Sequence, residues 1–358
     1  MRVIIVTGSS GGHIFPALAL LEELKSRSVE VKLVAPAKES AMSMLKEVPG
    51  VIYIRPCRMG SGSLGRNIRE VPSFLAGAWE SLRIIIKFRP DVVVGFGSLH
   101  TLAMLFWGWL FRVKTIIHEQ NVVPGRANRV LAKFADKIAL SFPQTACRLC
   151  VRGEKTCVTG NPLRRGMSRM DKKESLDRLG LQHGKFTLLV AGGSQGAHRL
   201  NETVYSALAG CRESFQVVHI SGAEDYAPLK DAYAQAGIKS MVFDFFHDMQ
   251  YAYSAADLAI CRAGATTIAE LQRFSLPAVL VPYPFAYEHQ LENAKVLEGR
   301  RCALVIREDD LSADKIREQV MAFLLDRQRL ESMRSSYPPA ASRDASAMLA
   351  GEVMDLKR

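Results

Sequence analysis

Glycine-rich turns that separate predicted strands from predicted helices are the residues of this chain best suited to chemistry. One such turn, Gly8-Ser9-Ser10-Gly11-Gly12-His13, follows an apolar run at residues 3–6. Another, Gly192-Gly193-Ser194-Gln195-Gly196-Ala197, follows an apolar run at residues 186–191, and a third turn lies near Gly264. Glycine lets backbone N–H groups approach an anion closely, and a helix N-terminus adds about half a positive charge. Anion-binding turns in both halves suggest an enzyme that holds a nucleotide between two domains.

His13 is the residue of the first turn that could act as a base. It lies where a helix is predicted to start, at the carboxyl end of a strand, and ligands bind at that end in open α/β sheets. Imidazole titrates near neutral pH, so His13 could remove a proton from a substrate hydroxyl. A histidine that only satisfies a local backbone group, in a turn that binds no ligand, is the other interpretation.

Polar segments also follow later strands. His118-Glu119-Gln120-Asn121 comes after an apolar strand at residues 115–117, and Gly160-Asn161-Pro162-Leu163-Arg164 forms a rigid turn. The guanidinium of Arg164 suits a phosphate. We expect these segments to line a cleft, although each polar residue alone is equally compatible with a scaffold role.

The second half offers two further segments beside predicted helix starts. Residues 261–270 lead from a strand into a helix, so their backbone can form another anion site. Glu270 could accept hydrogen bonds from ribose hydroxyls or simply complement the helix dipole. Gln290, at the start of a helix after a proline-containing loop, could bind sugar hydroxyls.

Strands that alternate with helical segments must position these turns, and this alternation predicts parallel, doubly wound α/β sheets. In the first half the apolar strands are expected at residues 3–6, 31–34, 51–54, 92–95, 115–117 and 137–139. After a polar linker and exposed helix at 161–184 the pattern restarts, with strands at 186–191, 217–220, 242–245, 258–260 and 278–281. We expect two domains, residues 1–163 and 164–340, and a last helix within 341–358 that packs back on the first domain.

Composition restricts the partners. The 358 residues suffice for two domains, and 47 Lys and Arg against 36 Asp and Glu give a net charge of +11. Because the chain has no RNA-binding signature or zinc-finger spacing, we expect no nucleic acid and favour a phosphorylated substrate or an anionic lipid surface. The seven scattered cysteines are typical of reduced thiols in a cytosolic protein, with no metal site. We see no secretory signal, and the longest apolar run, residues 101–111, is too short to span a bilayer.

Taken in order, these segments resemble the MurG family, the inverting N-acetylglucosaminyltransferases of peptidoglycan synthesis, over almost the entire chain. The combination of residues 118–121, 160–164 and 192–197 is quite specific to that family. The resemblance implies a GT-B fold, in which two Rossmann-like doubly wound parallel-sheet domains face a cleft. It also implies transfer of N-acetylglucosamine (GlcNAc) from UDP-GlcNAc to the 4-hydroxyl of lipid I, MurNAc-(pentapeptide)-diphospho-undecaprenol, to form lipid II without a cofactor or metal.

The resemblance implies roles for individual residues. His13 matches the family's proposed general base. The positions that match its UDP-GlcNAc site are Ser10, Gly11, Gly12, Asn121, Arg164, Ser194, Phe246, Arg262, Ala265, Thr266, Thr267, Ile268, Ala269, Glu270 and Gln290. The positions that match its acceptor diphosphate site are Ser10, Gly11, Gly12 and Ser98.

Two turns depart from the family pattern. Residues 8–12 read Gly-Ser-Ser-Gly-Gly where the family has Gly-Gly-Thr-Gly-Gly, which keeps a hydroxyl. Residues 95–100, Gly-Phe-Gly-Ser-Leu-His, replace a second family turn, Gly-Gly-Tyr/Phe, that helps to hold the acceptor diphosphate. Ser98 and His100 can still bind phosphate. The departure leaves open a GT-B glycosyltransferase with a different lipid or small-molecule acceptor.

A lipid acceptor implies a peripheral location on the cytoplasmic face of the cell membrane. Apolar and aromatic residues beside cations are typical of an interfacial anchor on an anionic membrane surface. Here they are residues 71–75, Trp79, Phe106, Trp107 and Trp109, with Arg66, Arg69, Arg83, Lys87, Arg112 and Lys114. A helix that is buried against the sheet would account for the same pattern.

Other function classes fit less well. A UDP-GlcNAc 2-epimerase shares the architecture, but the catalytic carboxylates it would need around the sugar have no evident place in the sequence. A Rossmann dehydrogenase needs a G-x-G-x-x-G turn and an acidic residue after the second strand, whereas residues 31–34 run into Ala35-Pro36. A binding module without catalysis is also less consistent with the sequence, because polar residues are present at all five of the positions Asn121, Arg164, Ser194, Glu270 and Gln290.

Overall fold

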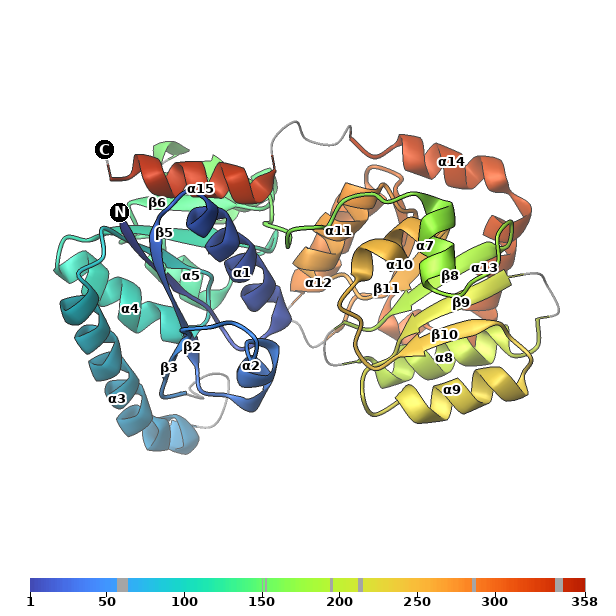
Figure 1. Ribbon diagram of the computed structural model, residues 1–358, viewed down its shortest axis with the longest axis horizontal. Helices are drawn as coiled ribbons and strands as arrows, with labels where there is room; N and C mark the ends of the chain where they lie inside the picture. Colours follow the sequence, from blue (N-terminus) through green and yellow to red (C-terminus); the bar gives the residue numbers. More distant parts are fainter. Residues whose placement is uncertain are drawn as a thin grey trace. The chain divides into compact units, whose positions relative to one another are not determined.

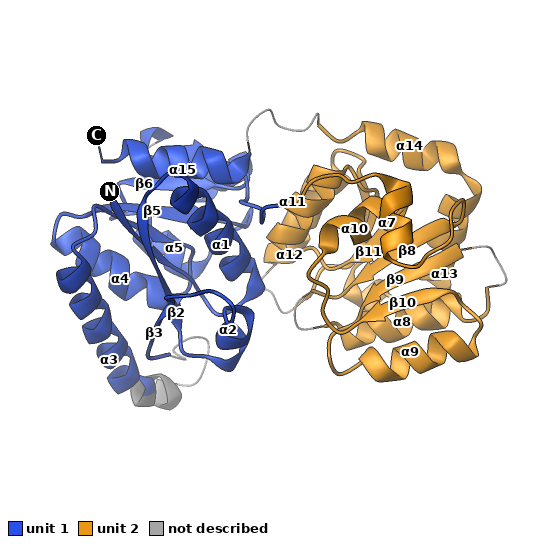
Figure 2. Ribbon diagram, in the orientation of Figure 1, with its two compact units in different colours: residues 1–165, 342–358 blue, residues 166–341 orange. Residues whose placement is uncertain are grey.

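The computed structural model describes residues 1–56, 64–149, 151, 153–193, 196–211, 215–284, 288–338 and 344–357, with only the backbone of residues 64–69. The chain divides into two compact units (Figures 1 and 2). Unit 1 contains residues 1–165 and 342–358, and unit 2 contains residues 166–341. Each unit has one parallel sheet with helices on both faces. The predicted fold class, two doubly wound α/β domains, is confirmed.

Unit 1 is built on a seven-stranded sheet in the order β3-β2-β1-β4-β5-β6-β7. The sequence order of the strands reverses between β1 and β4, where Val6 pairs with Gly95. Ligands bind at such a switch point, beyond the carboxyl ends of the strands. The turns that follow β1 and β4 therefore start side by side. The strands are β1 (Arg2–Val6), β2 (Glu30–Pro36), β3 (Ile52–Ile54), β4 (Val92–Gly95), β5 (Lys114–Glu119), β6 (Lys137–Leu140) and β7 (Thr156–Val158).

The helices of unit 1 cover both faces of this sheet because its Val and Ile side chains are buried on each side. They are α1 (Gly11–Ser26), α2 (Glu39–Met44), α3 (Leu64–Phe88), α4 (Leu99–Leu110), α5 (Arg126–Leu131), α6 (Ala146–Leu149) and α15 (Ala345–Asp355). The C-terminal helix α15 packs against α1. Arg27 donates a hydrogen bond to the carbonyl oxygen of Ala347 at 3.2 Å, and Lys137 pairs with Glu352. The end of the chain is thus part of unit 1.

Unit 2 repeats the plan with six strands in the order β10-β9-β8-β11-β12-β13. Here the order reverses between β8 and β11, where Ala191 pairs with Cys261. The glycine turn after β8 and the turn after β11 therefore start side by side as well. The strands are β8 (Phe186–Ala191), β9 (Phe215–Ile220), β10 (Ser240–Phe243), β11 (Leu258–Cys261), β12 (Ala278–Leu280) and β13 (Ala303–Val305).

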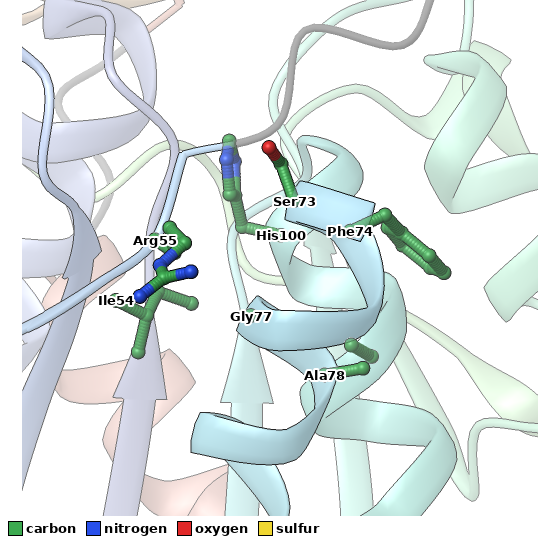
Figure 3. A pocket seen from close by; sticks show the side chains of 8 residues that line it. Ile54, Arg55, Ser73, Phe74, Gly77, Ala78 and His100 are labelled. Carbon is green, nitrogen blue, oxygen red and sulfur yellow. The ribbon is translucent and has the colours of Figure 1, made fainter. Parts of the chain in front are cut away.

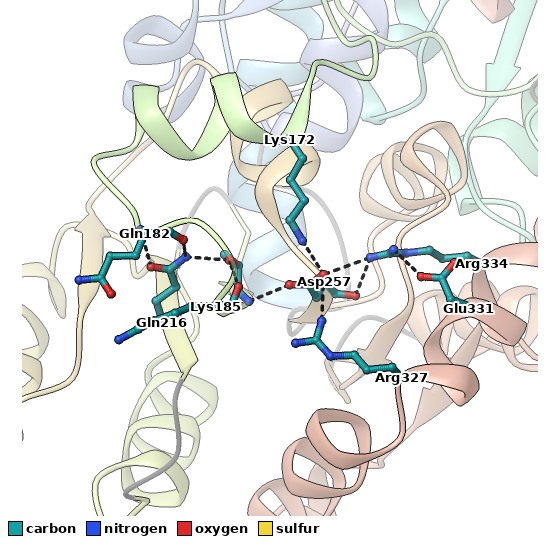
Figure 4. A network of polar contacts seen from close by, with 9 residues as sticks. Lys172, Gln182, Lys185, Gln216, Asp257, Arg327, Glu331 and Arg334 are labelled. Atoms are coloured by element: carbon teal, nitrogen blue, oxygen red, sulfur yellow. Dashed lines mark hydrogen bonds and ion pairs between the residues drawn. The ribbon is translucent and has the colours of Figure 1, made fainter.

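A single buried carboxylate joins several elements of unit 2 (Figure 4). Asp257 precedes β11 and is 4% exposed. It accepts hydrogen bonds from the Thr187 backbone N–H at 2.9 Å and from Lys172 Nζ at 2.5 Å, and Arg334 Nη2 lies 3.5 Å from it. These contacts fix two helices to the sheet. The helices of unit 2 are α7 (Lys172–Arg178), α8 (His198–Leu208), α9 (Tyr226–Gln235), α10 (Met249–Ala255), α11 (Ala265–Phe274), α12 (His289–Glu298), α13 (Ala313–Leu325) and α14 (Arg327–Ser335).

The structure differs from the sequence prediction at several elements. The strands β7 and β13, each of three residues at a sheet edge, are absent from the prediction. Helix α1 begins at Gly11, inside the glycine turn at residues 8–13 and two residues before His13. The predicted linker at 161–184 is partly built into unit 2, since Lys172 reaches Asp257.

Candidate active site

The turn between β1 and α1 directs the hydroxyl of Ser10 to a histidine instead of to the helix. Ser10 is the N-cap residue of α1, but its side chain makes no capping hydrogen bond. Its Oγ lies 2.8 Å from Nδ1 of His13, while the backbone N–H groups of His13 and Ile14 donate to its carbonyl oxygen at 3.0 Å. Gly11 is buried and Gly12 exposed. The first turn of α1 thus fixes both the position and the hydrogen bonding of the His13 ring.

Two glycines make room for this ring. A Cβ on Gly8 would lie 3.0 Å from Nδ1 of His13, and one on Gly97 would lie 3.2 Å from its Nε2. Gly97 also has φ +82°, a backbone conformation that residues other than glycine rarely adopt. Because Gly97 follows β4, the turns after β1 and β4 meet at His13, as their strand positions require. The structure thus brings together Ser10, His13 and the turn that contains Ser98.

The turn after β4 is strained at the position where this chain departs from the family pattern. Ser98 has φ 81°, in the region that favours glycine. Its Oγ lies 3.1 Å from Nδ1 of His100, and Thr101 Oγ1 donates to the carbonyl oxygen of Gly97. Burial, with a smaller contribution from the charge of Lys38, lowers the pKa of His100 to about 4. His100 is therefore neutral at pH 7.

Three of the four polar residues at 118–121 are buried supports, which corrects the expectation that all four line a cleft. The Nε2–H group of His118 donates a hydrogen bond to the carbonyl oxygen of Gly160 at 3.0 Å, and burial lowers the pKa of His118 to about 4. Gln120 donates to the carbonyl oxygen of Phe96 at 3.3 Å. His118, Glu119 and Gln120 are each at most 2% exposed. A polar residue after a strand has the same sequence signature whether it faces a ligand or the protein.

Glu119 organises the loop that carries Asn121. Its Oε1 accepts from the backbone N–H of Asn121 at 2.9 Å, and its Oε2 accepts from the Gly125 N–H at 2.9 Å and from Asn128 Nδ2 at 2.8 Å. Asn121 is half-buried, and its Nδ2 lies 3.3 Å from the same carboxylate. Asn128 is a buried residue that the sequence did not single out, and its position near Gly97 places it beside the His13 turn.

Arg164 lies in unit 1, just before the boundary that follows Arg165. Its guanidinium lies 4.8 Å from the centroid of the Phe15 ring on α1, a cation–π contact. Sequence reasoning placed Arg164 at the start of the second domain. The sequence feature that could have assigned Arg164 to the first domain is Phe15, an aromatic residue two positions after the glycine turn whose ring can stack under a guanidinium.

The glycine turn after β8 needs glycine for its shape. A Cβ on Gly192 would lie 2.6 Å from the backbone nitrogen of Ala197, and one on Gly196 would lie 2.7 Å from the carbonyl oxygen of Ser221. Gly193 and Gly196 have φ +92° and +75°. Ser194, a predicted site residue, lies outside the described residues. The turn leads into α8, whose first turn has no acidic residue and no capping side chain, so its N-terminus can accept an anion.

The turn after β11 leads into α11 in the same way. Gly264 is the N-cap, and the first turn, Ala265-Thr266-Thr267, again has no acidic residue and no side-chain cap. Further along α11, Ile268 is buried, whereas Ala269 and Glu270 are partly exposed. Tyr253 donates a hydrogen bond to Oε2 of Glu270 at 2.8 Å, which orients this carboxylate. The α8 and α11 N-termini both start at the switch point of unit 2.

Gln290 and Arg262 support the α11 turn from two sides. Gln290 Oε1 accepts from the backbone N–H groups of Ala263 at 3.2 Å and of Tyr283 at 2.9 Å. Arg262 is buried, donates to the carbonyl oxygen of Val281 at 3.1 Å and forms a two-pronged ion pair with Glu308. Sequence reasoning missed Glu308 because it lies 46 residues from its partner. Phe246, another predicted site residue, stacks on Phe243 with ring centroids 4.4 Å apart.

The chain matches a known family over both units. Residues 3–140 match the glycosyltransferase family 28 N-terminal domain, and residues 187–348 match the glycosyltransferase family 28 C-terminal domain. The chain is 38% identical to a UDP-N-acetylglucosamine–N-acetylmuramyl-(pentapeptide) pyrophosphoryl-undecaprenol N-acetylglucosamine transferase of Anaeromyxobacter sp. (strain Fw109-5), covering 99% of this chain and 92% of the relative.

Solved structures agree. The crystal structure of Acinetobacter baumannii MurG has a TM-score of 0.78 and 26% identity, with 99% of both chains covered. A UDP-GlcNAc 2-epimerase from Neisseria meningitidis, solved with UDP-GlcNAc bound, has a TM-score of 0.71 but only 14% identity over 99% of this chain and 100% of that chain, and it shows the fold alone. The expected GT-B architecture is confirmed.

Proposed function

Because this chain belongs to glycosyltransferase family 28, we propose that it transfers N-acetylglucosamine from UDP-GlcNAc to the 4-hydroxyl of lipid I, N-acetylmuramyl-(pentapeptide) pyrophosphoryl-undecaprenol. The observation that carries the proposal is the difference between the two switch points. The switch point of unit 1 holds a histidine whose ring is fixed by Ser10 and two glycines. The switch point of unit 2 holds two helix N-termini with no acidic residue in their first turns.

Unit 2 binds the donor in this proposal. The diphosphate lies against the N-termini of α8 and α11, where backbone N–H groups and the helix dipoles stabilise its charge. This stabilisation increases as the leaving group gains charge in the transition state. Glu270, oriented by Tyr253, accepts hydrogen bonds from the ribose hydroxyls. Gln290 uses its carbonyl oxygen to hold the loops, so its amide N–H group is the part that donates to the GlcNAc hydroxyls.

Unit 1 activates the acceptor. A bond forms between the acceptor O4 and C1 of GlcNAc, and the bond between C1 and the diphosphate oxygen breaks, so that its electron pair leaves with UDP. The O4 proton goes to Nε2 of His13. Before the reaction, Nδ1–H of His13 donates a hydrogen bond to Ser10 Oγ, 2.8 Å away. This hydrogen bond holds the ring in the tautomer whose Nε2 is unprotonated and can accept the proton. Attack from the face opposite UDP inverts the configuration at C1.

The membrane surface that we propose lies on unit 1. Along α3, Val71, Leu75 and Trp79 are exposed at intervals of four residues, with Leu75 and Trp79 each 60% exposed. The exposed cations Arg83 and Lys87 lie on the same helix. On α4, the rings of Phe106 and Trp109 are also exposed, and Trp109 contacts the ring of Phe134. Apolar side chains beside cations favour an anionic lipid surface.

Not all of the apolar residues predicted for this surface are exposed. Phe74 is half-buried and Trp107 donates a hydrogen bond to the Ala78 carbonyl oxygen at 2.9 Å, so these two side chains are not the exposed part. None of the helices in the described part of the chain is both long and apolar enough to cross a bilayer. Replacing Leu75 and Trp79 together by serine should weaken sedimentation with vesicles of anionic phospholipid, and unchanged sedimentation would contradict the proposed surface.

Release of UDP tests the proposed activity. The full chain is incubated with UDP-GlcNAc in the presence and absence of lipid I, and UDP is measured over time. We expect UDP release to depend on lipid I. If lipid I has no effect but another lipid or small-molecule acceptor stimulates release, the chain is a UDP-sugar glycosyltransferase with a different acceptor. If no acceptor stimulates release, the proposal is wrong.

A further inference from the structure

A hollow in unit 1 is too small to bind part of a substrate. It lies between the end of β3, helix α3 and the start of α4, and Ile54, Gly77 and His100 are among the residues that line it (Figure 3). Its cavity of about 10 Å³ has room for about one water molecule. The polar side chains beside the first turn of α8, in unit 2, are better placed to act on a ligand.

Asp225 is the N-cap residue of α9, but its carboxylate contacts α8 instead. The side chain makes no capping hydrogen bond, although an aspartate at this position usually satisfies the first N–H groups of its own helix. Its Oδ1 accepts a hydrogen bond at 2.6 Å from Nδ1–H of His198, the first residue of α8. Its Oδ2 accepts a hydrogen bond from Nδ2 of Asn201 at 2.7 Å. The carboxylate therefore joins the loop after β9 to the first turn of α8.

A buried chain of hydrogen bonds fixes this carboxylate from the core of unit 2. Asn201 is fully buried, and its Nδ2 also donates to the carbonyl oxygen of Ser221 at 2.8 Å. Burial lowers the pKa of His219 to about 3, so its ring is neutral and has one donor and one acceptor nitrogen. Nε2–H of His219 donates to Oδ1 of Asn201 at 3.0 Å, and the hydroxyl of Tyr233 donates to Nδ1 of His219 at 3.0 Å. The position of Asp225 is thus determined by buried neighbours.

The same chain reaches the glycine turn after β8, where the donor diphosphate lies in the proposed function. The carbonyl oxygen of Ser221, which Asn201 holds, is the atom that a Cβ on Gly196 would meet at 2.7 Å. The backbone N–H of Asn201 donates to the carbonyl oxygen of Ala197 at 2.9 Å. Asp225 and Asn201 together therefore fix the end of this turn that leads into α8.

The charge at the start of α8 depends on the protonation of His198. Its ring lies 3.3 Å from Glu202 as well as 2.6 Å from Asp225, and Glu224 is close enough to affect its charge. The hydrogen bond to Asp225 and the charges of these carboxylates raise the pKa of His198 above its ordinary value of 6.5. More than half of the His198 rings are therefore protonated at pH 6.5.

Loss of this proton would leave excess negative charge beside the proposed anion site. A protonated His198 offsets the carboxylate of Asp225, whereas a neutral ring offsets none of the three carboxylates. Arg199, the next residue of α8, points to Glu308 at 4.0 Å and does not replace the histidine. A diphosphate at the helix N-terminus is stabilised by positive charge nearby and destabilised by negative charge. Donor affinity should therefore fall as the pH rises and His198 loses its proton.

We propose that Asp225 and His198 are a positioning pair for the donor, in which Asp225 holds a protonated His198 against the start of α8 and the pair keeps the diphosphate site able to bind an anion. This inference rests on the proposed function, which supplies a nucleoside diphosphate sugar as the ligand of unit 2. The pair acts on donor binding and not on the reacting atoms. Neither residue belongs to the site predicted from the sequence.

The pH dependence of donor binding tests the pair without turnover. Calorimetric titration of the full chain with UDP-GlcNAc at pH 6 and at pH 8.5 gives the two dissociation constants. Each phosphate of this ligand carries a substituent, so the charge of the diphosphate is the same at both pH values. We expect the dissociation constant to be roughly fivefold higher at pH 8.5, the effect of losing one positive charge at close range in water. Equal dissociation constants would overturn the proposal.

Two substitutions of His198 separate its charge from its shape. His198→Arg keeps a cation beside Asp225 at both pH values, so the affinity that the wild-type protein has at pH 6 should persist at pH 8.5. His198→Gln has no charge at either pH, so its affinity should equal that of the wild-type protein at pH 8.5 throughout. A pH dependence of wild-type size in either variant would contradict the proposal.

Asp225→Asn tests the other member of the pair. It removes the main cause of the raised pKa of His198, so the midpoint of the pH dependence of UDP-GlcNAc binding should move to lower pH. A purely structural role of Asp225 would change the affinity without moving this midpoint. A midpoint that stays at the wild-type pH would therefore contradict the assignment, and the His198 variants provide the test if Asp225→Asn does not fold.

A second histidine–aspartate pair in unit 2 provides the matched control. His183 Nε2 lies 2.7 Å from Asp177, a distance close to that between His198 and Asp225. His183 precedes β8, whereas His198 follows it, so the two pairs lie at opposite ends of this strand. His183→Gln should therefore retain the full pH dependence of UDP-GlcNAc binding. Loss of the pH dependence in this control would show that His198 is not its source.

The binding result separates this inference from the proposed function. A protein that transfers GlcNAc to lipid I but binds UDP-GlcNAc equally at both pH values retains the proposed function and lacks the positioning pair. A protein whose affinity for UDP-GlcNAc follows the charge of His198, but which transfers no GlcNAc to lipid I, has the positioning pair, and the proposed function is then wrong.

Discussion

The two switch points of this protein are built alike but use different parts of the chain for recognition. In unit 2 the turns after β8 and β11 present backbone, and Gly192 and Gly196 are required because a Cβ would collide with the backbone of Ala197 or Ser221. In unit 1 the turns present side chains, with Ser10 and His13 in one turn and Ser98 in the other. A site made of backbone depends on a few glycines, whereas a site made of side chains can change its chemistry by single substitutions.

The largest effect that separates the two regions should come from His13→Ala. Removing the base should lower the turnover number by about 10²- to 10⁴-fold, the usual contribution of general base catalysis. The dissociation constant of UDP-GlcNAc, which unit 2 determines in our account, should change little. Acceptor-dependent UDP release and calorimetric titration of UDP-GlcNAc measure the two quantities. A near-normal turnover number would remove His13 as the base.

Glu308→Gln should lower the stability of unit 2. It leaves the buried guanidinium of Arg262 without its carboxylate, and such a loss costs about 3–5 kcal/mol. Asp309→Asn is the matched control, since Asp309 is adjacent and exposed. Thermal unfolding of the full chain measures both variants. If the two variants had equal melting temperatures, the Arg262–Glu308 pair would not support the α11 turn.

Acid should destabilise unit 1 more than unit 2. The pKa values of His100 and His118 are lowered by burial to about 4, and that of His219 in unit 2 to about 3. The unfolded chain, in which histidine titrates near 6.5, therefore binds more protons than the folded chain at pH values between about 4 and 6.5. These histidines leave the free energy of unfolding unchanged above pH 6.5 and lower it by about 1.4 kcal/mol per histidine for each pH unit below that, until the pKa of the folded state is reached.

Hydrogen exchange of the full chain at pH 6.5 and pH 5 resolves this difference by unit. Protection should fall more in the strands of unit 1, which has two such histidines, than in those of unit 2, which has one. His100→Gln should reduce the pH dependence in unit 1 and leave unit 2 unchanged. An equal loss of protection in both units, or no effect of His100→Gln, would contradict the assignment.

Ser10→Ala should have a smaller effect on catalysis than His13→Ala. Without the hydroxyl, the His13 ring loses the hydrogen bond that fixes its tautomer, and we expect the turnover number to fall by about tenfold, the equivalent of one hydrogen bond of about 1.4 kcal/mol. Ser10→Thr keeps the hydroxyl and should restore most of the activity. The pH profile of kcat should shift in Ser10→Ala but not in Ser10→Thr. Unaltered profiles in both variants would mean that Ser10 does not position His13.

The sequence predicts the backbone sites better than the side-chain sites, for a physical reason. Glycine-rich strand-to-helix turns are visible in the sequence, and the turns that follow β1, β8 and β11 start at the switch points of the two sheets. Glycine is required by space at Gly192 and Gly196, whereas a Cβ would be accommodated at Gly12 and Gly264. The alternation of strands and helices is equally visible, apart from the short edge strands β7 and β13.

Polar side chains are harder to place because burial is decided by the tertiary structure. His118 and Glu119 end β5 and Gln120 follows it, as ligand-binding residues would, yet all three hydrogen-bond to the backbone of loops. Glu308 is not recognisable because its partner Arg262 is distant in the sequence. The strain at Ser98 is likewise visible only in the backbone dihedral angle.

Transfer of labelled GlcNAc from UDP-GlcNAc to lipid I tests most directly the claim that unit 2 binds the donor and His13 of unit 1 activates the acceptor. The full chain and its His13→Ala variant are given the same labelled donor and purified lipid I, and the labelled lipid product and the bound donor are both measured. We predict that the wild-type protein forms a lipid-linked disaccharide with inverted configuration at C1. The His13→Ala variant should bind the donor equally well and form almost no product. If the wild-type protein labels no lipid I, or if the variant labels it at the wild-type rate, the account is contradicted.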